Sequence, residues 1–166
     1  MEKKQGFTLI EVVVVMIIIS IVAGIAMITI HSNSRKHDET LAKQLTNTLL
    51  LAEQEAMLGP KTLGLAVTSQ SFQFYQLERD AKTDENHWVP MNEPPFRAHR
   101  FPANTHVTLK IQDEIISANS EPKIIITPGN DLTPFVIFIG KMGESPTYLI
   151  TGKANGEVTS AAFQAK

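Results

Sequence analysis

The sequence predicts an α+β protein in which one long N-terminal helix, membrane-spanning in its first half, packs on a C-terminal antiparallel β-sheet domain. Three observations predict this fold: an uncharged apolar run near the N-terminus, a helical stripe of apolar residues after it, and β-type patterns beyond Pro60. With 166 residues, 43% of them hydrophobic, the chain can form the core of one domain but is short for two.

The first half of the helix is expected to cross a membrane. Residues 12–30 carry no charge and, at about 1.5 Å per helical residue, extend roughly 28 Å, close to the thickness of a bilayer core. Lys3 and Lys4 precede this run, whereas Arg35 and Lys36 follow it only after a polar stretch. The positive-inside rule therefore predicts a cytoplasmic N-terminus and places the C-terminal domain on the other side.

Two common kinds of N-terminal apolar segment fit these residues poorly. A cleaved secretory signal has an apolar run of about 7 to 15 residues, and the run that begins at Phe7 is longer. An ordinary membrane anchor gains nothing from Glu11, because an acid at mid-membrane costs about 2.5 to 3.5 kcal/mol. That cost falls near a helix end, so a plain anchor that tolerates Glu11 at the interface stays open as an interpretation.

The segment KKQGFTLIEVVVV resembles the class III signal of type IV pilins and type II secretion pseudopilins. The resemblance implies that residues 1–6 are a leader, that prepilin peptidase cuts after Gly6, and that Phe7 becomes the N-methylated N-terminus. Residues 7–30 would then form the transmembrane and filament-forming half of the helix. Cleavage leaves an α-ammonium on Phe7, with a pKa near 8 in model compounds. Glu11 of an incoming subunit can neutralise that charge on a neighbour, which implies a role in assembly register.

Residues 31–59 are predicted to form the amphipathic half of the same helix. Its apolar stripe runs from Leu41 to Ala56 at spacings of three or four, and Gly59-Pro60 ends it. The stripe consists of Leu41, Leu45, Leu49, Ala52 and Ala56. Ser32-Asn33-Ser34 are poor helix formers, so two helices joined by a linker are an alternative; the absence of an interior proline favours one helix over residues 7–58.

Residues 60–166 are predicted to form the periplasmic β-rich domain. The strand candidates share alternating or continuous apolar patterns and are residues 63–68, 71–77, 107–112, 123–127, 135–139 and 148–151. Short turn signals between them favour antiparallel connections in a single sheet that packs on the helical stripe. Residues 78–102 are rich in charge and proline and are predicted to be a long loop, with Trp88 and Phe96 folding back on the sheet edge.

A second resemblance lies in the C-terminal half. The segments 126–129, 133–135 and 152–158, which are ITPG, TPF and GKANGEV, look like the H-type minor pseudopilins of type II secretion. The related minor pilins of type IV pili share that domain. Cysteine is absent, which argues against a major type IV pilin closed by a disulfide. Residues 158–166 contain no carboxylate for the calcium-binding loop of a major pseudopilin.

The function implied is that of a non-enzymatic minor pseudopilin, anchored by one helix in a bacterial inner membrane, that helps to export folded proteins across the outer membrane. The implied partners are other major and minor pseudopilins, prepilin peptidase and the inner-membrane assembly platform. No cofactor, metal site or nucleic acid is expected: the histidines lack ligand spacing, Asp80, Asp84 and Glu85 lack the EF-hand pattern, and the net charge is -2.

Two alternatives remain open at this point. One is a minor pilin of a type IV pilus in assembly, adhesion or DNA uptake, for which Arg97, His99 and Arg100 would supply a basic patch. The other is a plain membrane-anchored sensor or binding module, in which Glu11 would have no role in assembly.

Overall fold

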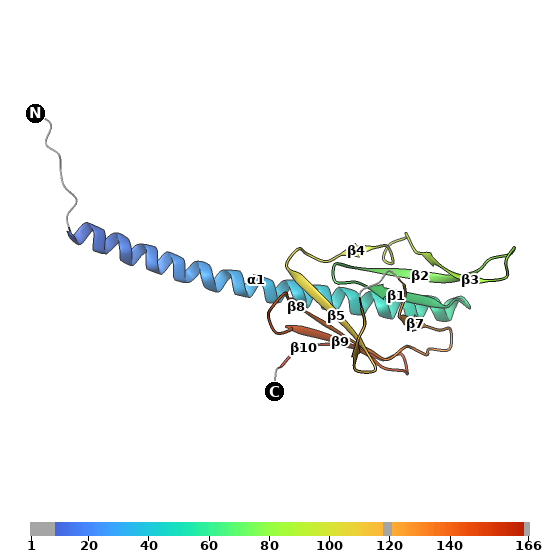
Figure 1. The fold of residues 1–166 in the computed structure, drawn as a ribbon. Helices are drawn as coiled ribbons and strands as arrows, with labels where there is room; N and C mark the ends of the chain where they lie inside the picture. The colour runs from blue at the N-terminus through green and yellow to red at the C-terminus, as the bar shows by residue number, and fades with distance from the viewer. Residues whose placement is uncertain (1–8, 118–120, 165–166) are drawn as a thin grey trace, which may run out of the picture. The chain divides into compact units, whose positions relative to one another are not determined.

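The computed structural model describes residues 9–117 and 121–164 of the chain, and within residues 25–34 it describes the backbone alone. Contacts divide the chain into two compact units, residues 1–37 and 38–166. Helix α1 begins at Leu9 and ends at Leu58. It is unbroken through Ser32-Asn33-Ser34, so the prediction of one continuous helix is confirmed (Figure 1).

Between Leu9 and Val22, in the first unit, apolar side chains project from α1 in every direction. Every large apolar side chain described from Leu9 to Val22 is between 45% and 83% exposed. The Ser20 hydroxyl donates to the Met16 carbonyl oxygen at 2.8 Å, which satisfies its hydrogen-bonding group within the helix. Among the residues that the structure describes, no helix is long and apolar enough to meet the criteria for a membrane span.

In the second unit, α1 buries the predicted stripe. Leu41, Leu45, Leu49, Ala52 and Ala56 are all at most 5% exposed and belong to the hydrophobic core. Gly59 donates its backbone N–H to the Glu55 carbonyl oxygen at 3.2 Å, and the helix ends there because Pro60 cannot continue it.

The first five-stranded antiparallel sheet, sheet A, begins with the strand that follows α1 in the chain. Its strand order is β3-β2-β1-β7, with β4 also paired to β2. The bounds are β1 Leu63–Val67, β2 Ser71–Arg79, β3 Asn86–Pro90, β4 His99–Arg100 and β7 Ile124–Ile126. All five residues of β1 are buried, as expected for a central strand covered on both faces.

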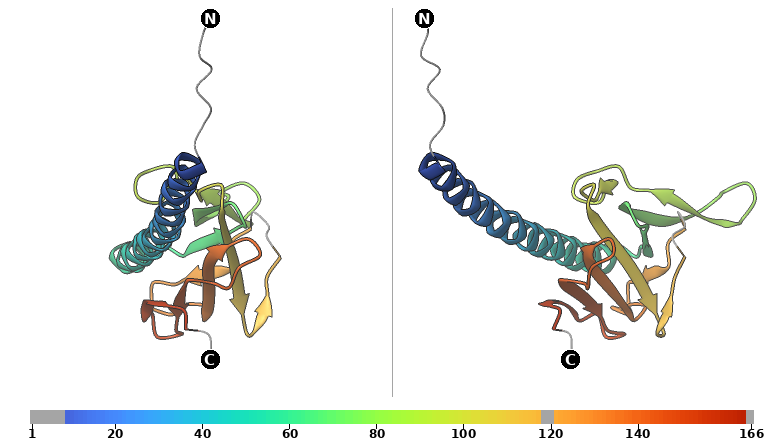
Figure 2. Two further views of the ribbon diagram at one scale, coloured as in Figure 1. Left: turned by 90° about the vertical axis from the view of Figure 1, so that its left-hand side faces the viewer. Right: turned by 60° about the vertical axis from the view of Figure 1, so that its left-hand side comes forward.

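A second five-stranded antiparallel sheet, sheet B, has the order β10-β9-β8-β5-β6. The bounds are β5 Thr105–Ile111, β6 Glu114–Ile115, β8 Phe135–Lys141, β9 Tyr148–Gly152 and β10 Val158–Ala162. Alternate residues of β8, namely Phe135, Ile137 and Ile139, point into the core that both sheets share with α1. The strands β1 and β2 and the strands β8 and β9 form separate layers (Figure 1, Figure 2).

The expectation of a single sheet is therefore wrong. All six predicted strands exist, but β5 pairs with β8 and starts a new sheet instead of continuing the first. Strand periodicity identifies which face of a strand is buried and carries no information about its partner strand. Four strands were not predicted, and two of these, β4 and β6, have only two residues each.

The segment from residue 78 to 102 is also more ordered than a long loop. It holds the end of β2, the edge strand β3 and the short β4. Phe96 is 9% exposed and packs edge-on against Phe74, with ring centroids 5.5 Å apart. Trp88 covers Gly64, where a Cβ would lie 2.9 Å from the indole. The prediction that a loop aromatic residue folds back on the sheet is confirmed for Phe96, whereas Trp88 belongs to the edge strand β3 itself.

Gly152 gives a prediction about packing in sheet B. Gly152 pairs with Phe135 across β9 and β8, and a Cβ on Gly152 would overlap the Phe135 ring. We expect Gly152→Ala to lower the free energy of unfolding by about 1 to 3 kcal/mol through overpacking. Urea unfolding followed by fluorescence of Trp88, the one tryptophan, would measure it.

Gly129→Ala is the matched control, because its added Cβ would meet the nearest atom at 3.5 Å, an ordinary contact. Equal losses of stability in the two variants would contradict the packing explanation. Phe135→Leu should restore part of the stability lost in Gly152→Ala, since it removes ring atoms from the point of overlap.

Candidate assembly site

The N-terminal residues singled out by the sequence are Gly6, Phe7 and Glu11, and the structure describes one of them. Gly6 and Phe7 lie outside the described residues. Glu11 lies in the first turn of α1, where an acidic side chain interacts favourably with the partial positive charge of the helix N-terminus. Its side chain is exposed and has no hydrogen-bond or ion-pair partner among the described residues.

Glu11 is the single charged residue between Leu9 and Gly24. The surrounding side chains are apolar on every side of the helix, which is the pattern of a helix that is buried by something other than its own chain. When such a helix leaves water, Glu11 must find a partner of opposite charge or bear the cost of burial unpaired. From Leu9 to Gly24, α1 is therefore an apolar helix with one carboxylate available for an external cation.

The C-terminal residues that carry the second resemblance come together in the second unit. They form two neighbouring turns, between β7 and β8 and between β9 and β10. The Asn130 side-chain amide donates to the Asn155 carbonyl oxygen at 2.9 Å, and Leu132 N–H donates to the Ala154 carbonyl oxygen at 3.2 Å. Gly156 has φ near +81°, and a Cβ there would lie 2.7 Å from the Asn130 side chain. The glycine thus allows the two turns to touch.

An ion pair closes the second of these turns. Lys153 Nζ lies 2.8 Å from Glu157 Oε2, and the lysine ammonium lowers the pKa of the Glu157 carboxyl. Both side chains are about half exposed, so the pair contributes little to stability on its own. Segments 126–135 and 152–158 are consequently joined by backbone and side-chain bonds, which sequence spacing did not predict.

Asp38 is a buried acid at the start of the second unit. It is 3% exposed, and its Oδ2 accepts a hydrogen bond of 2.7 Å from the Thr147 hydroxyl. Thr147 also donates its backbone N–H to the Ile139 carbonyl oxygen at 2.8 Å. Through Asp38 the turn between β8 and β9 is held against α1.

Glu53 is a second buried acid on α1, and its burial is unfavourable for folding. It is 6% exposed, and its Oε1 has no hydrogen-bond partner among the described residues. Burial disfavours the charged form and raises the pKa of Glu53 above 4.5, its usual value. Because the pKa of Glu53 is higher in the folded chain than in the unfolded chain, protonation of Glu53 favours folding. This contribution to stability is complete below the unfolded pKa, and it is lost as the pH rises through the folded pKa.

We therefore expect Glu53→Gln to be more stable than the natural chain at pH 7, by about 1 kcal/mol, because glutamine removes the negative charge and burying a charged group costs more than burying a neutral polar one. The two proteins should approach equal stability near pH 4. Urea unfolding at both pH values would measure this difference. Glu114→Gln, at an exposed position, is the control. Its free energy of unfolding should differ little from that of the natural chain at either pH.

The other polar clusters noted in the sequence have local roles. Asp80 Oδ1 accepts backbone N–H bonds from Lys82 at 2.7 Å and Thr83 at 3.3 Å, and these bonds lower the pKa of the carboxyl. Asp84 pairs with Arg79 at 2.5 Å. The described residues contain no group of three or more side chains placed to bind a metal ion. These acids therefore shape the turn between β2 and β3.

The basic patch is divided by the structure. Arg97 and His99 line a hollow beside α1, whereas Arg100 is not among its lining residues. Arg100 lies in β4, paired with Ser71. His99 stacks on Phe72 with ring centroids 5.3 Å apart. His99 and Arg100 are consecutive residues of β4, so their side chains point to opposite faces of the strand.

Comparison with known proteins finds matches for the N-terminal segment and for most of the chain. Residues 1–27 match the family described as the prokaryotic N-terminal methylation motif. A type II secretion system protein H of Pectobacterium carotovorum subsp. carotovorum is 22% identical over 181 residues, covering 99% of this chain and 96% of that protein. The protein of the same name from Pseudomonas aeruginosa is 27% identical over 157 residues, covering 86% of this chain and 87% of that protein.

Two solved structures share the fold. The minor pseudopilin EpsH from the type 2 secretion system of Vibrio cholerae superposes with a TM-score of 0.65 at 18% identity, over 76% of this chain and 96% of that one. The solution structure of Escherichia coli GspH gives a TM-score of 0.61 at 16% identity, over 78% of this chain and 90% of that one. The predicted α+β, pilin-like fold is confirmed, and so is the resemblance to H-type proteins.

Proposed function

We propose that this chain is an H-type minor pseudopilin of a type II secretion system, a non-enzymatic subunit of the pseudopilus that helps to export folded proteins across the outer membrane. One observation carries the proposal: helix α1 connects an N-terminal methylation motif to a globular unit that has the fold of minor pseudopilins. Similarity to the H proteins over 86% or more of the chain supports the same role.

In this proposal the leader, residues 1–6, is removed by prepilin peptidase, and Phe7 is methylated. Residues 7–30 hold the protein in the bacterial inner membrane as a single pass, with the N-terminus cytoplasmic and residues 60–166 in the periplasm. The apolar residues of α1 that are exposed in the isolated chain support this arrangement, because they need a lipid or protein environment.

Assembly would then exchange lipid contacts for contacts with other major and minor pseudopilins on the inner-membrane platform. Packing of apolar helices supplies affinity without specifying an axial position. A charge pair between Glu11 of one subunit and the α-ammonium of a neighbour would specify it, since a mismatched register leaves both charges buried and unpaired. Residues 31–59 join that helix to the domain that is presented in the periplasm.

Intact-mass spectrometry of the chain from cells with active prepilin peptidase tests the proposal. We expect a mature protein that begins at Phe7 and carries one added methyl group. Gly6→Val is the control and should yield the uncut chain, because the branched side chain hinders access of the peptidase to the backbone. Recovery of the natural chain with residues 1–6 still attached would overturn the proposed function.

A further inference from the structure

A hollow of about 610 Å³ lies between residues 40–48 of α1 and residues 94–99, and its size is in the range of small-molecule sites. Two cations and one histidine line it from three parts of the fold. Lys43 comes from α1, Arg97 from the turn before β4, and His99 from β4. The described lining residues include no acid. We call this site the basic hollow.

The parts of the chain that carry these side chains are fixed by contacts outside the basic hollow. Arg97 donates its backbone N–H to the Glu93 carbonyl oxygen at 3.1 Å, and Phe96 beside it is buried. The His99 ring stacks on Phe72 with centroids 5.3 Å apart, and the two residues pair across β4 and β2. Donors on a fixed backbone lose less conformational freedom when a ligand binds.

The basic hollow has hydrogen-bond donors that the chain itself does not use. No described residue forms a hydrogen bond or an ion pair with the side chain of Arg97 or His99. Lys43 Nζ lies 2.6 Å from Glu39, which raises the pKa of Lys43, but an ammonium has three donors and this bond uses one. Because a guanidinium stays charged at every physiological pH, the site keeps a positive charge.

The rest of the wall suits an uncharged organic group. Gln44 and Asn47 of α1 line the site with side-chain amides, and Pro94, Pro95 and Phe72 line it with apolar surface. A single phosphate group would fill only a small part of about 610 Å³. The basic hollow therefore has room for an anion together with the group that carries it.

We propose that the basic hollow binds a phosphate ester of a small polyol. Arg97, His99 and Lys43 bind the phosphate, and the amides of Gln44 and Asn47 bind hydroxyl groups. A phosphate ester has about two negative charges and three acceptor oxygens, so donors from three parts of the fold can bind it together. A guanidinium pairs with phosphate through two parallel hydrogen bonds. The same ester occurs in solution and in the headgroup of a glycerophospholipid. This binding activity goes beyond the proposed pseudopilin role and does not depend on it.

Calorimetric titration of the full-length chain in a maltoside detergent tests the inference, with glycerol 3-phosphate as the probe. We expect a dissociation constant below about 1 mM. Arg97→Gln should weaken binding by about tenfold or more, because charge-assisted hydrogen bonds are lost. Arg100→Gln is the matched control: it removes the same charge three residues away, outside the lining of the hollow, and should leave the affinity unchanged. Unchanged Trp88 fluorescence would show that both variants keep the fold.

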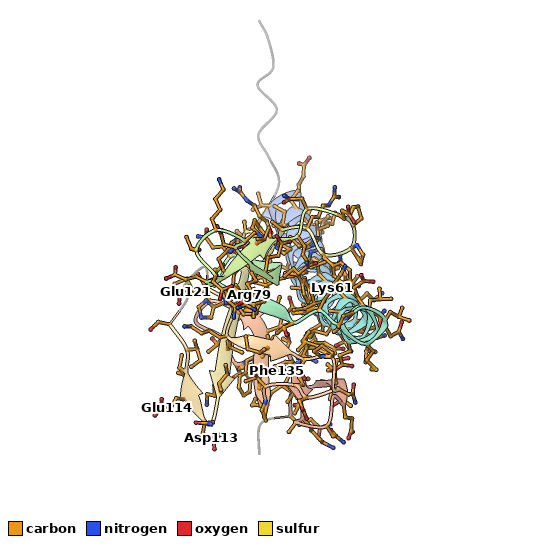
Figure 3. All side chains as sticks on the ribbon, turned by 90° about the vertical axis from the view of Figure 1, so that its right-hand side faces the viewer. Lys61, Arg79, Asp113, Glu114, Glu121 and Phe135 are labelled. Atoms are coloured by element: carbon orange, nitrogen blue, oxygen red, sulfur yellow. The ribbon has the colours of Figure 1, made fainter. Side chains whose placement is uncertain are left out.

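A second matched pair tests the lysine. Lys43→Gln should weaken binding by about threefold, the effect expected for one hydrogen bond. Lys61 also has a glutamate partner, Glu55, but it lines the neighbouring hollow at the end of α1 (Figure 3). Lys61→Gln should therefore leave the affinity unchanged.

Titration of the chain in nanodiscs that contain phosphatidylglycerol distinguishes the two sources of the ester. A lipid headgroup in the basic hollow would compete with the probe, so the apparent affinity for glycerol 3-phosphate would be about tenfold lower than in detergent. Equal affinities in nanodiscs and detergent would assign the site to a soluble ester.

Four outcomes would overturn the inference. Absence of binding at millimolar glycerol 3-phosphate would show that the hollow is not a site, and equal losses in Arg97→Gln and Arg100→Gln would reduce binding to general charge attraction. Equal affinity for glycerate or for inorganic phosphate would remove the requirement for a phosphate ester. A DNA duplex that binds more tightly than the ester, with the same dependence on Arg97, would assign the hollow to nucleic acid.

Discussion

Replacement of Glu11 by glutamine is expected to reduce incorporation of the chain into the pseudopilus by about a hundredfold or more. Glutamine keeps the size and helical preference of the side chain and removes its charge. The α-ammonium of a neighbouring Phe7 would then be buried without a counterion, and breaking a buried ion pair in this way costs about 3 to 5 kcal/mol. A tenfold change in an equilibrium constant corresponds to about 1.4 kcal/mol.

The measurement is the amount of chain recovered with sheared pseudopili, with secretion of an exported enzyme as a second readout. Glu11→Asp retains the charge on a shorter side chain and should retain part of the assembly. Glu114→Gln, the same chemical change on the globular unit, should assemble normally. Leader cleavage should be unchanged in all three variants, because Glu11 lies beyond the cleavage site.

Normal assembly of Glu11→Gln would favour the plain membrane anchor, in which this acid is only tolerated at the interface. It would remove the role of Glu11 in register while leaving the fold and its resemblance intact. The prediction therefore separates a filament subunit from an anchored binding module.

The parts of the fold that depend on local sequence could be predicted. Helix α1 was expected to end at Leu58 and does so, because Gly59-Pro60 is a local stop signal and the stripe from Leu41 to Ala56 repeats within a single helix. Strands with strong apolar patterns, such as β1 and β8, were also found within two residues of their predicted ends. In each case the signal lies inside the element or directly beside it.

Features that depend on distant parts of the chain could not be predicted. The partition into two sheets results from the pairing of β5 with β8, which are separated by β6 and β7 in the chain. Strand β3 contains Pro90, a residue that argues against a strand unless the strand lies at a sheet edge, as β3 does. Strand β10, VTSAA, has small and polar residues and only Val158 is buried, so no alternating pattern marks it.

The candidate functional residues also fall into two groups: those in a local sequence motif, and those that only the fold brings together. Gly6, Phe7 and Glu11 form a short linear motif, which a sequence can show completely, although the partner of Glu11 would lie on another subunit. A hollow beside α1 combines helix residues near position 50 with residues near position 95, and only the fold brings them together. Glu53 lay unnoticed beside the apolar stripe, because its burial depends on the sheets that pack around the helix.

Leu45→Ala is expected to have the largest effect on the stability of the globular unit. Leu45 is fully buried in the middle of the stripe, within the core that α1 shares with both sheets. Truncation of a buried leucine to alanine costs about 2 to 5 kcal/mol, because contacts are lost and the surroundings close the cavity only in part. A loss of this size is a large fraction of the total stability of about 5 to 15 kcal/mol that is usual for a domain.

Leu50→Ala supplies a control with the same chemical change on the same helix. Leu50 is 38% exposed, and we expect its truncation to cost less than about 1 kcal/mol. Urea unfolding of the full-length chain in detergent, followed by Trp88 fluorescence, would measure both variants. Similar losses would mean that α1 does not pack on the two sheets through the predicted stripe. A large loss in Leu45→Ala alone would show that the helix that carries the assembly motif is also the centre of the globular core.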